Sequence, residues 1–191
     1  IHIDEPLHLR NGLTPLHTEL DEWRHYVAPT SRRIQLRSFL QFALEGRLLD
    51  PFSGVSLRTL VRRLLVGGPA VVKFVRANRM LHWLDRSFDM RERILILRHP
   101  CAVVASQLSY ESSEWRKADL PDRQELQSAF GGWIPDDLFQ RFRGVLAGIE
   151  THAGYLAAVW CLDNYIPLRY EEGSFSGVVT TYERLVSHRS R

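Results

Sequence analysis

The sequence has little cysteine and no long apolar run, and both shortages narrow the class of protein. Its 191 residues include two cysteines, Cys101 and Cys161, and neither belongs to a Cys-x-x-Cys pair. Two isolated cysteines form neither a disulfide framework nor a metal site, so we expect free thiols buried in their apolar surroundings. No apolar run approaches the roughly 18 residues of a membrane span, and no signal-peptide pattern is present.

A strong excess of one charge is also lacking. The formal net charge is +3 at pH 7, with 45% hydrophobic and 25% charged residues, which is an ordinary globular composition. This mild basic excess suits an anionic substrate but is too weak to indicate a nucleic-acid partner. The length of 191 residues predicts a single domain over residues 1–191. The cytoplasm is the default compartment, and a membrane-anchored luminal protein is the alternative if an N-terminal anchor was trimmed.

The stretch over residues 93–110 carries the strongest signal in the chain. Residues 94–97, Ile-Leu-Ile-Leu, read as a short strand buried on both faces. Arg98 and His99 follow, and Pro100 then suits the first turn of a helix because its missing N–H costs nothing there. A strand that runs into a helix is expected to leave free backbone N–H groups, and the positive end of the helix dipole, at the carboxyl edge of a sheet.

This junction of strand and helix predicts an anion site. Arg98 adds a rigid fork of donors that matches a phosphate group. Ser106 lies about two helical turns beyond His99 on the same face, where its hydroxyl can reach the same anion. The alternative is an ordinary strand–helix unit with a solvated arginine and a helical serine.

The run that begins Arg98-His99-Pro100, with Ser106 eight residues after Arg98, resembles a motif of the sulfotransferases that use 3′-phosphoadenosine 5′-phosphosulfate (PAPS). In that family, an arginine and a serine at this spacing bind the 3′-phosphate of the nucleotide. The resemblance implies that Arg98 and Ser106 bind PAPS as the co-substrate, and nothing in the sequence requires a metal. It also implies an α/β fold like that of the P-loop sulfotransferases, with a short, mainly parallel sheet and helices on both faces.

A second segment lies at the start of the chain. Residues 4–8, Asp-Glu-Pro-Leu-His, resemble the Glu-Pro-Leu segment of carbohydrate sulfotransferases. In that family the glutamate is the candidate general base for the acceptor hydroxyl, which implies this catalytic role for Glu5, with His8 as a nearby alternative. A solvated acidic turn before a proline is the competing interpretation.

A third segment is a predicted strand over residues 70–75, followed by a predicted helix over 78–88. The strand resembles the Val-Lys-x-x-Arg element that carbohydrate sulfotransferases carry before the 3′-phosphate motif. This resemblance implies that Lys73 and Arg76 support the acceptor or the sulfate. A solvated basic pair at a strand end explains the same residues.

Two further helices and another strand complete the expected framework. Apolar spacing predicts helices over 57–66 and 138–162, and residues 177–182 read as a strand. Residues 182–185, Tyr-Glu-Arg-Leu, resemble the Tyr-Glu-Asp-Leu run near the end of the sulfotransferase domain, with arginine in place of the usual aspartate. We expect Glu183 to be architectural, since a negative charge is favourable in the first turn of a helix.

The element missing from this resemblance is the Gly/Ser/Thr-rich loop that cradles the 5′-phosphosulfate in sulfotransferases. No such loop precedes Glu5, and Gly67-Gly68-Pro69 cannot replace it because that run precedes a strand rather than following one. The chain is therefore expected to be either a fragment without its N-terminal strand and phosphate loop or a degenerate relative. Its start at Ile1, directly before the Glu-Pro segment, favours a fragment.

Taken together, these segments imply a sulfotransferase that moves a sulfuryl group from PAPS to a hydroxyl or amine of a carbohydrate or small-metabolite acceptor. Glu5 would deprotonate the acceptor, while Arg98 and Ser106 would fix the nucleotide. The alternative is a non-catalytic anion- or nucleotide-binding domain that keeps Arg98 and Ser106. A nucleotide kinase would need a Walker-type loop and acidic magnesium ligands, and the sequence shows neither.

Overall fold

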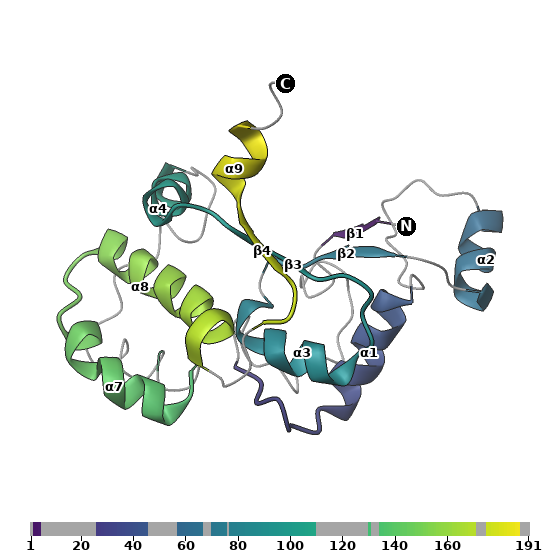
Figure 1. Ribbon diagram of the computed structural model, residues 1–191, viewed down its shortest axis with the longest axis horizontal. Helices are drawn as coiled ribbons and strands as arrows, with labels where there is room; N and C mark the ends of the chain where they lie inside the picture. Colours follow the sequence, from purple (N-terminus) through teal and green to yellow (C-terminus); the bar gives the residue numbers. More distant parts are fainter. Residues whose placement is uncertain are drawn as a thin grey trace.

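Two short parallel sheets and the helices around them make up the described part of the chain (Figure 1). The computed structural model describes residues 2–4, 26–45, 57–66, 70–75, 77–109, 130, 134–170 and 175–187. The expected α/β class, with parallel strands flanked by helices, is confirmed. Instead of one short sheet, however, the described strands form two sheets of two strands each.

Each sheet is a single parallel pair of strands. The first pairs β1 (His2–Asp4) with β2 (Val71–Lys73), and the second pairs β3 (Ile94–Leu97) with β4 (Val178–Thr181). The predicted strands are therefore confirmed. β3 has its predicted bounds, while β2 and β4 are shorter than the runs that predicted them.

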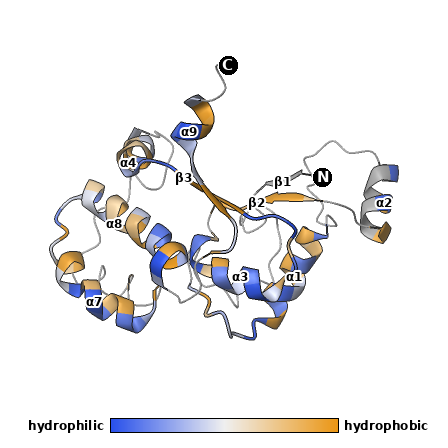
Figure 2. Ribbon diagram, in the orientation of Figure 1, coloured by the Kyte–Doolittle hydropathy of each residue, from blue (hydrophilic) through white to orange (hydrophobic). Residues whose placement is uncertain are grey.

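β3 is covered on one face rather than on two. Leu95 is buried, whereas Ile94 is 64% exposed and Ile96 is 53% exposed. The prediction of a strand buried on both faces is therefore wrong. Successive side chains alternate across a strand, and the described elements cover only the face to which Leu95 belongs. Figure 2 shows β3 in the colour of apolar residues at the centre of the molecule.

Helices surround these strands in Figure 1. In chain order, the described helices and helical turns are α1 (Ile34–Leu44), α2 (Leu57–Val66), the 3-10 turn η3 (Asn78–Met80), α3 (Leu81–Ser87), α4 (Pro100–Ser109), α7 (Asp136–Ala147), α8 (His152–Tyr165), the π-helical turn η4 (Ile166–Tyr170) and α9 (Tyr182–Ser187). The helix predicted over 57–66 is confirmed at both bounds, and the helix predicted over 78–88 is found as η3 followed by α3.

The single helix predicted over 138–162 is wrong, because the chain turns between α7 and α8. The N–H of Gly148 donates to the carbonyl oxygen of Val145 at 3.2 Å and ends α7. Thr151 then begins α8, since its Oγ1 accepts the N–H of Gly154 at 3.0 Å in an N-cap. The apolar spacing continues through both helices, so periodicity alone does not reveal the turn.

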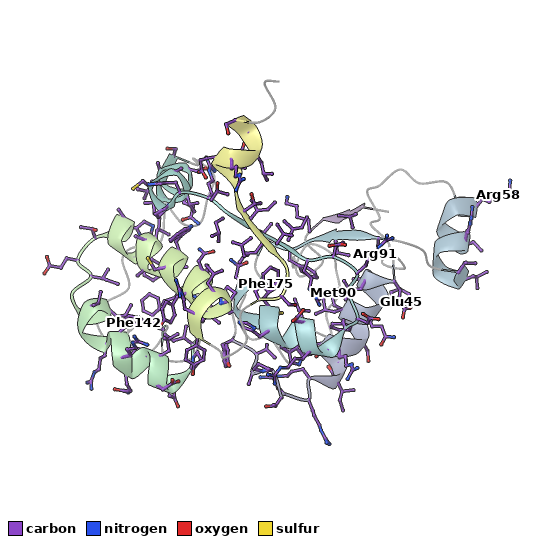
Figure 3. All side chains as sticks on the ribbon, in the orientation of Figure 1. Glu45, Arg58, Met90, Arg91, Phe142 and Phe175 are labelled. Atoms are coloured by element: carbon purple, nitrogen blue, oxygen red, sulfur yellow. The ribbon has the colours of Figure 1, made fainter. Side chains whose placement is uncertain are left out.

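Two large apolar clusters, with a smaller third one around Ala43, form the described core. One packs α7 against α8 around Leu138 and Leu156, and the other packs α1 against α3 around Trp83. Phe142 of α7 meets Tyr165 of α8 edge to face, with 5.4 Å between ring centroids. Figure 3 shows Phe142 between these two helices. Trp83 is almost fully buried in the second of these clusters.

A buried ion pair joins η3 to α8. Arg79 Nε lies 2.7 Å from Asp163 Oδ1, and the two side chains are 1% and 19% exposed. Beside this pair, Asn78 Nδ2 donates to Asn164 Oδ1 at 3.5 Å. These side-chain contacts connect parts of the chain that are 84 and 86 positions apart.

Polar contacts also connect α3 to the residues that precede β3 and β4. Asp85 of α3 forms an ion pair with Arg93, the residue before β3. The same carboxylate accepts the hydroxyl of Ser176 at 3.1 Å, two residues before β4. Phe175, which Figure 3 labels near the centre of the molecule, is buried next to this network.

Both cysteines are free, as predicted, but both lie at the surface. The prediction that they are buried is therefore wrong. Cys101 belongs to the first turn of α4, a helix with no buried residue. Cys161 lies on α8, where partial burial raises the pKa of its thiol without covering the residue.

Candidate functional site

The predicted junction of strand and helix is present at the end of β3. The register pairs Leu97 of β3 with Thr181 of β4, so Arg98 and Tyr182 leave the sheet next to each other. The guanidinium carbon of Arg98 lies 5.4 Å from the centroid of the Tyr182 ring. A cation–π contact of this kind contributes about 0.5–1 kcal/mol at an exposed site, and it orients the planar guanidinium.

Glu183 follows Tyr182 and reaches across to the same junction. Its Oε1 accepts the backbone N–H of His99 at 2.9 Å. This hydrogen bond is the main reason that the pKa of Glu183 lies below its ordinary value. The residue's own N–H and the electrostatic attraction of His99 and Arg98 act in the same direction. A carboxylate of the protein thus lies close to Arg98 at the start of α4.

The other backbone donors at the start of α4 are also bonded within the protein. Cys101 donates its N–H to Nδ1 of His99 at 3.3 Å, and Ala102 and Val103 donate to the His99 carbonyl oxygen at 3.0 and 3.1 Å. The expectation of free N–H groups at this junction is therefore wrong. The reason is that Glu183 and the His99 imidazole accept bonds that a helix N-terminus otherwise leaves open.

Ser106 lies on the side of α4 opposite to the side that packs on α8. Val104 and Leu108 pack against the α7–α8 cluster, and with Ala157 of α8 they line a shallow pocket of about 280 Å³. At 100° per residue, Ser106 lies roughly 160° around the helix from both apolar residues. It also lies about 10 Å along the axis beyond His99.

Arg98 and Ser106 both present their donors to solvent. Each residue is exposed, and neither makes a side-chain hydrogen bond or ion pair with another residue of the described ranges. The guanidinium carries five N–H donors and a full positive charge, and the serine adds one hydroxyl. Each group is chemically suited to donate to the oxygen atoms of an anion.

Of the remaining predicted site residues, only Lys73 is described. It is exposed at the end of β2, in the sheet that shares no strand with β3 and β4. Glu5, His8 and Arg76 lie outside the described residues. The described part of the site is therefore Arg98 and Ser106 with the neighbours that surround Arg98.

Sequence reasoning missed the contribution of Tyr182 and Glu183 to the surroundings of Arg98. The structure confirms Glu183 in the first turn of α9, but its bond to His99 was not predicted. A signal was present in the sequence. Two apolar strands, each running directly into a helix, bring their following residues to one edge when the strands are parallel neighbours.

The described ranges also bear on metal binding and on membrane insertion. No group of three or more His, Cys, Asp or Glu side chains in these ranges is arranged to hold a metal ion. No helix within them has the length and apolar character needed to cross a membrane.

Comparison with known proteins gives this chain no relative. The functional interpretation therefore depends on the geometry around Arg98 and on the motifs of the sequence. No family model matches the chain, and no curated protein or solved structure is significantly similar to it.

Proposed function

We propose that this chain is a sulfotransferase domain of the P-loop type, which transfers a sulfuryl group from PAPS to a hydroxyl or amine of a carbohydrate or small-metabolite acceptor. The observation that carries the proposal is the position of Arg98 at the junction of β3 and α4, with Ser106 eight residues later on that helix. Arg98 leaves β3 directly before α4, and Ser106 is exposed on that helix. The two residues hold the positions of the 3′-phosphate motif in the family that the sequence resembles.

The surroundings of Arg98 suit a phosphate group. The Tyr182 ring limits the orientations of the guanidinium, so less side-chain freedom is lost when an anion binds. Ser106 supplies a neutral donor about two helical turns beyond the junction. Because the N–H of His99 is bonded to Glu183, side chains rather than the α4 backbone would make the contacts to the anion.

In the proposed reaction, the acceptor oxygen attacks sulfur in line while Glu5 takes the acceptor proton. The new S–O bond forms as the S–O bond to the 5′-phosphate breaks, and adenosine 3′,5′-bisphosphate leaves with the electron pair. Fixing the nucleotide by its 3′-phosphate aligns the reacting atoms, which is a major source of rate acceleration in group transfer. His8 is the alternative base, and Lys73 and Arg76 are assigned to the acceptor or the sulfate.

Calorimetric titration with adenosine 3′,5′-bisphosphate tests the nucleotide site. Arg98→Ala removes a charge-assisted contact, so we expect binding to weaken by roughly ten- to a hundredfold, which corresponds to about 1.5–3 kcal/mol. The matched control is Arg143→Ala, which removes an exposed arginine from α7 and should leave the affinity unchanged. Equal affinities for the wild-type chain and Arg98→Ala would refute the assignment of Arg98.

A non-catalytic anion-binding domain is the second candidate function. The exposed donors of Arg98 and Ser106 favour it, because they can hold an anion without a general base or a phosphosulfate loop. An assay of transfer from radiolabelled PAPS to a panel of sugars separates the two functions. Transfer would exclude the second candidate. Bisphosphate binding without transfer is expected of either candidate in a chain without the phosphosulfate loop, so a Gly/Ser/Thr-rich loop with a basic residue in the upstream sequence would then favour the enzyme and its absence the binding domain.

A further inference from the structure

Glu183 places a negative charge beside the residue that is proposed to receive an anion. Its carboxylate accepts the His99 N–H at 2.9 Å, and Arg98 is one of the groups that attract this carboxylate electrostatically. An anion bound to Arg98 would therefore meet a like charge. It would also find the nearest main-chain donor already engaged.

The contact made by Glu183 differs from the other contacts at the start of α4. The N–H groups of Ala102 and Val103 bond to a backbone carbonyl, so releasing them would unwind the helix. The His99 N–H bonds to a side chain of another element, and Glu183 is exposed on α9. We therefore expect a rotation of the Glu183 side chain to free the His99 donor without unwinding α4.

We propose that Glu183 is a specificity-determining residue that competes with the anionic ligand for the surroundings of Arg98. The inference rests on the proposed function, because it takes Arg98 to be the anion-binding residue. In the free protein, Glu183 occupies the His99 donor. A phosphate group at Arg98 either displaces this carboxylate or binds beside its negative charge, and both alternatives cost binding free energy. The site therefore favours ligands that offset this cost with several anionic contacts over simple inorganic anions.

The test is a titration of the full chain with inorganic phosphate at low ionic strength. Binding is monitored by NMR through the backbone amide resonances of Arg98 and His99. Glu183→Gln removes the charge and keeps an oxygen that can accept the His99 N–H. We expect this variant to bind phosphate about three- to tenfold more tightly than the wild-type chain. Added salt should reduce the difference because both charges are exposed.

Two variants control the comparison. Glu150→Gln removes an exposed charge between α7 and α8 and should leave phosphate affinity unchanged. Arg98→Ala combined with Glu183→Gln should abolish the response, which would show that the gain acts at Arg98.

The outcomes separate this inference from the proposed function. Tighter binding by Glu183→Gln, or binding by that variant alone, supports competition. Equal or weaker binding by Glu183→Gln, with a wild-type response that depends on Arg98, overturns the inference and leaves the anion site intact. No response in any variant overturns the inference, and the proposed function is then decided separately by the titration of the wild-type chain and Arg98→Ala with adenosine 3′,5′-bisphosphate.

Discussion

At the scale of single residues, Glu183 stabilises the folded chain while its carboxylate is ionised. The bond from the His99 N–H lowers the pKa of Glu183 in the folded state. A group with a lowered pKa contributes stability above its ordinary value of about 4.3, and the contribution is lost as the pH falls through the folded-state value. The stability that Glu183 contributes is therefore fully present at neutral pH and absent in strong acid.

Glu183→Gln should accordingly lower the thermal unfolding midpoint slightly at neutral pH. The difference from the wild-type chain should shrink below about pH 4, because glutamine resembles the protonated glutamate. Circular dichroism melts at neutral pH and at roughly pH 3 measure this difference. A difference that stays constant across this range would show that the carboxylate charge is not its cause.

The positions of Arg98 and Ser106, the two residues proposed to bind an anion, could be predicted from the sequence, and their neighbours could not. Arg98 and Ser106 belong to one local strand–helix run, so strand and helix geometry places them. The bond between Glu183 and His99 joins residues 84 positions apart. Local periodicity contains no information about which strand pairs with β3, and that pairing decides which residues meet Arg98.

At the scale of elements, the start of β4 depends on the absence of a side chain at Gly177. The N–H of Val178 donates to the Arg93 carbonyl at 2.9 Å and begins the pairing with β3. A Cβ at position 177 would collide with this carbonyl oxygen and with the Phe175 ring. The backbone oxygen cannot move without disturbing the pairing, so the glycine is required by close approach.

Gly177→Ala should therefore destabilise the chain by about 1–3 kcal/mol, as overpacking typically does. Gly144→Ala is the matched control, since a Cβ at this helical position meets nothing within 4 Å. It should stabilise α7 by up to about 1 kcal/mol. Urea unfolding measures both variants, and equal effects of the two substitutions would contradict the close-approach argument.

The elements themselves were predicted to different degrees. α2 has its predicted bounds because apolar periodicity marks a helix strongly. The division between α7 and α8 was not predicted, since it depends on the Thr151 cap and on a turn that leaves the apolar period intact. The exposure of β3 was not predicted either, because an apolar run does not reveal how many faces are covered.

At the scale of the whole molecule, the ion pair between Arg79 and Asp163 connects η3 to α8. The Arg79 side chain is almost fully buried, and the Asp163 carboxylate supplies its opposite charge at 2.7 Å. Removing one partner of a buried pair leaves a charge in an apolar environment, which typically costs about 3–5 kcal/mol. The pair therefore constrains how the two apolar clusters are held together.

Asp163→Ala should lower the free energy of unfolding by about 3–5 kcal/mol. Asp89→Ala, which removes an exposed aspartate before β3, should change it by no more than about 0.5 kcal/mol. Urea unfolding of the two variants checks the prediction. A cost below about 1 kcal/mol for Asp163→Ala would show that the buried arginine is satisfied by other contacts.

The α/β class was predictable at this scale, and the division into two sheets was not. Parallel strands alternating with helices are typical of this class, and the structure confirms it. The strand sequences, His-Ile-Asp, Val-Val-Lys, Ile-Leu-Ile-Leu and Val-Val-Thr-Thr, do not show which strands pair. The pairing depends on packing over long sequence separations, such as the contact of Val72 in β2 with Ala43 in α1.

The two parallel strand pairs, β1–β2 and β3–β4, form two separate hydrogen-bond ladders, and this separation affects the cooperativity of unfolding. No backbone hydrogen bond joins β1–β2 to β3–β4 within the described ranges, so one ladder can open while the other stays closed. Separately bonded segments of this kind behave as distinct foldons with their own opening free energies. A ligand that touched both ladders would stabilise their closed states together, and binding would then turn two partly independent units into one cooperative transition.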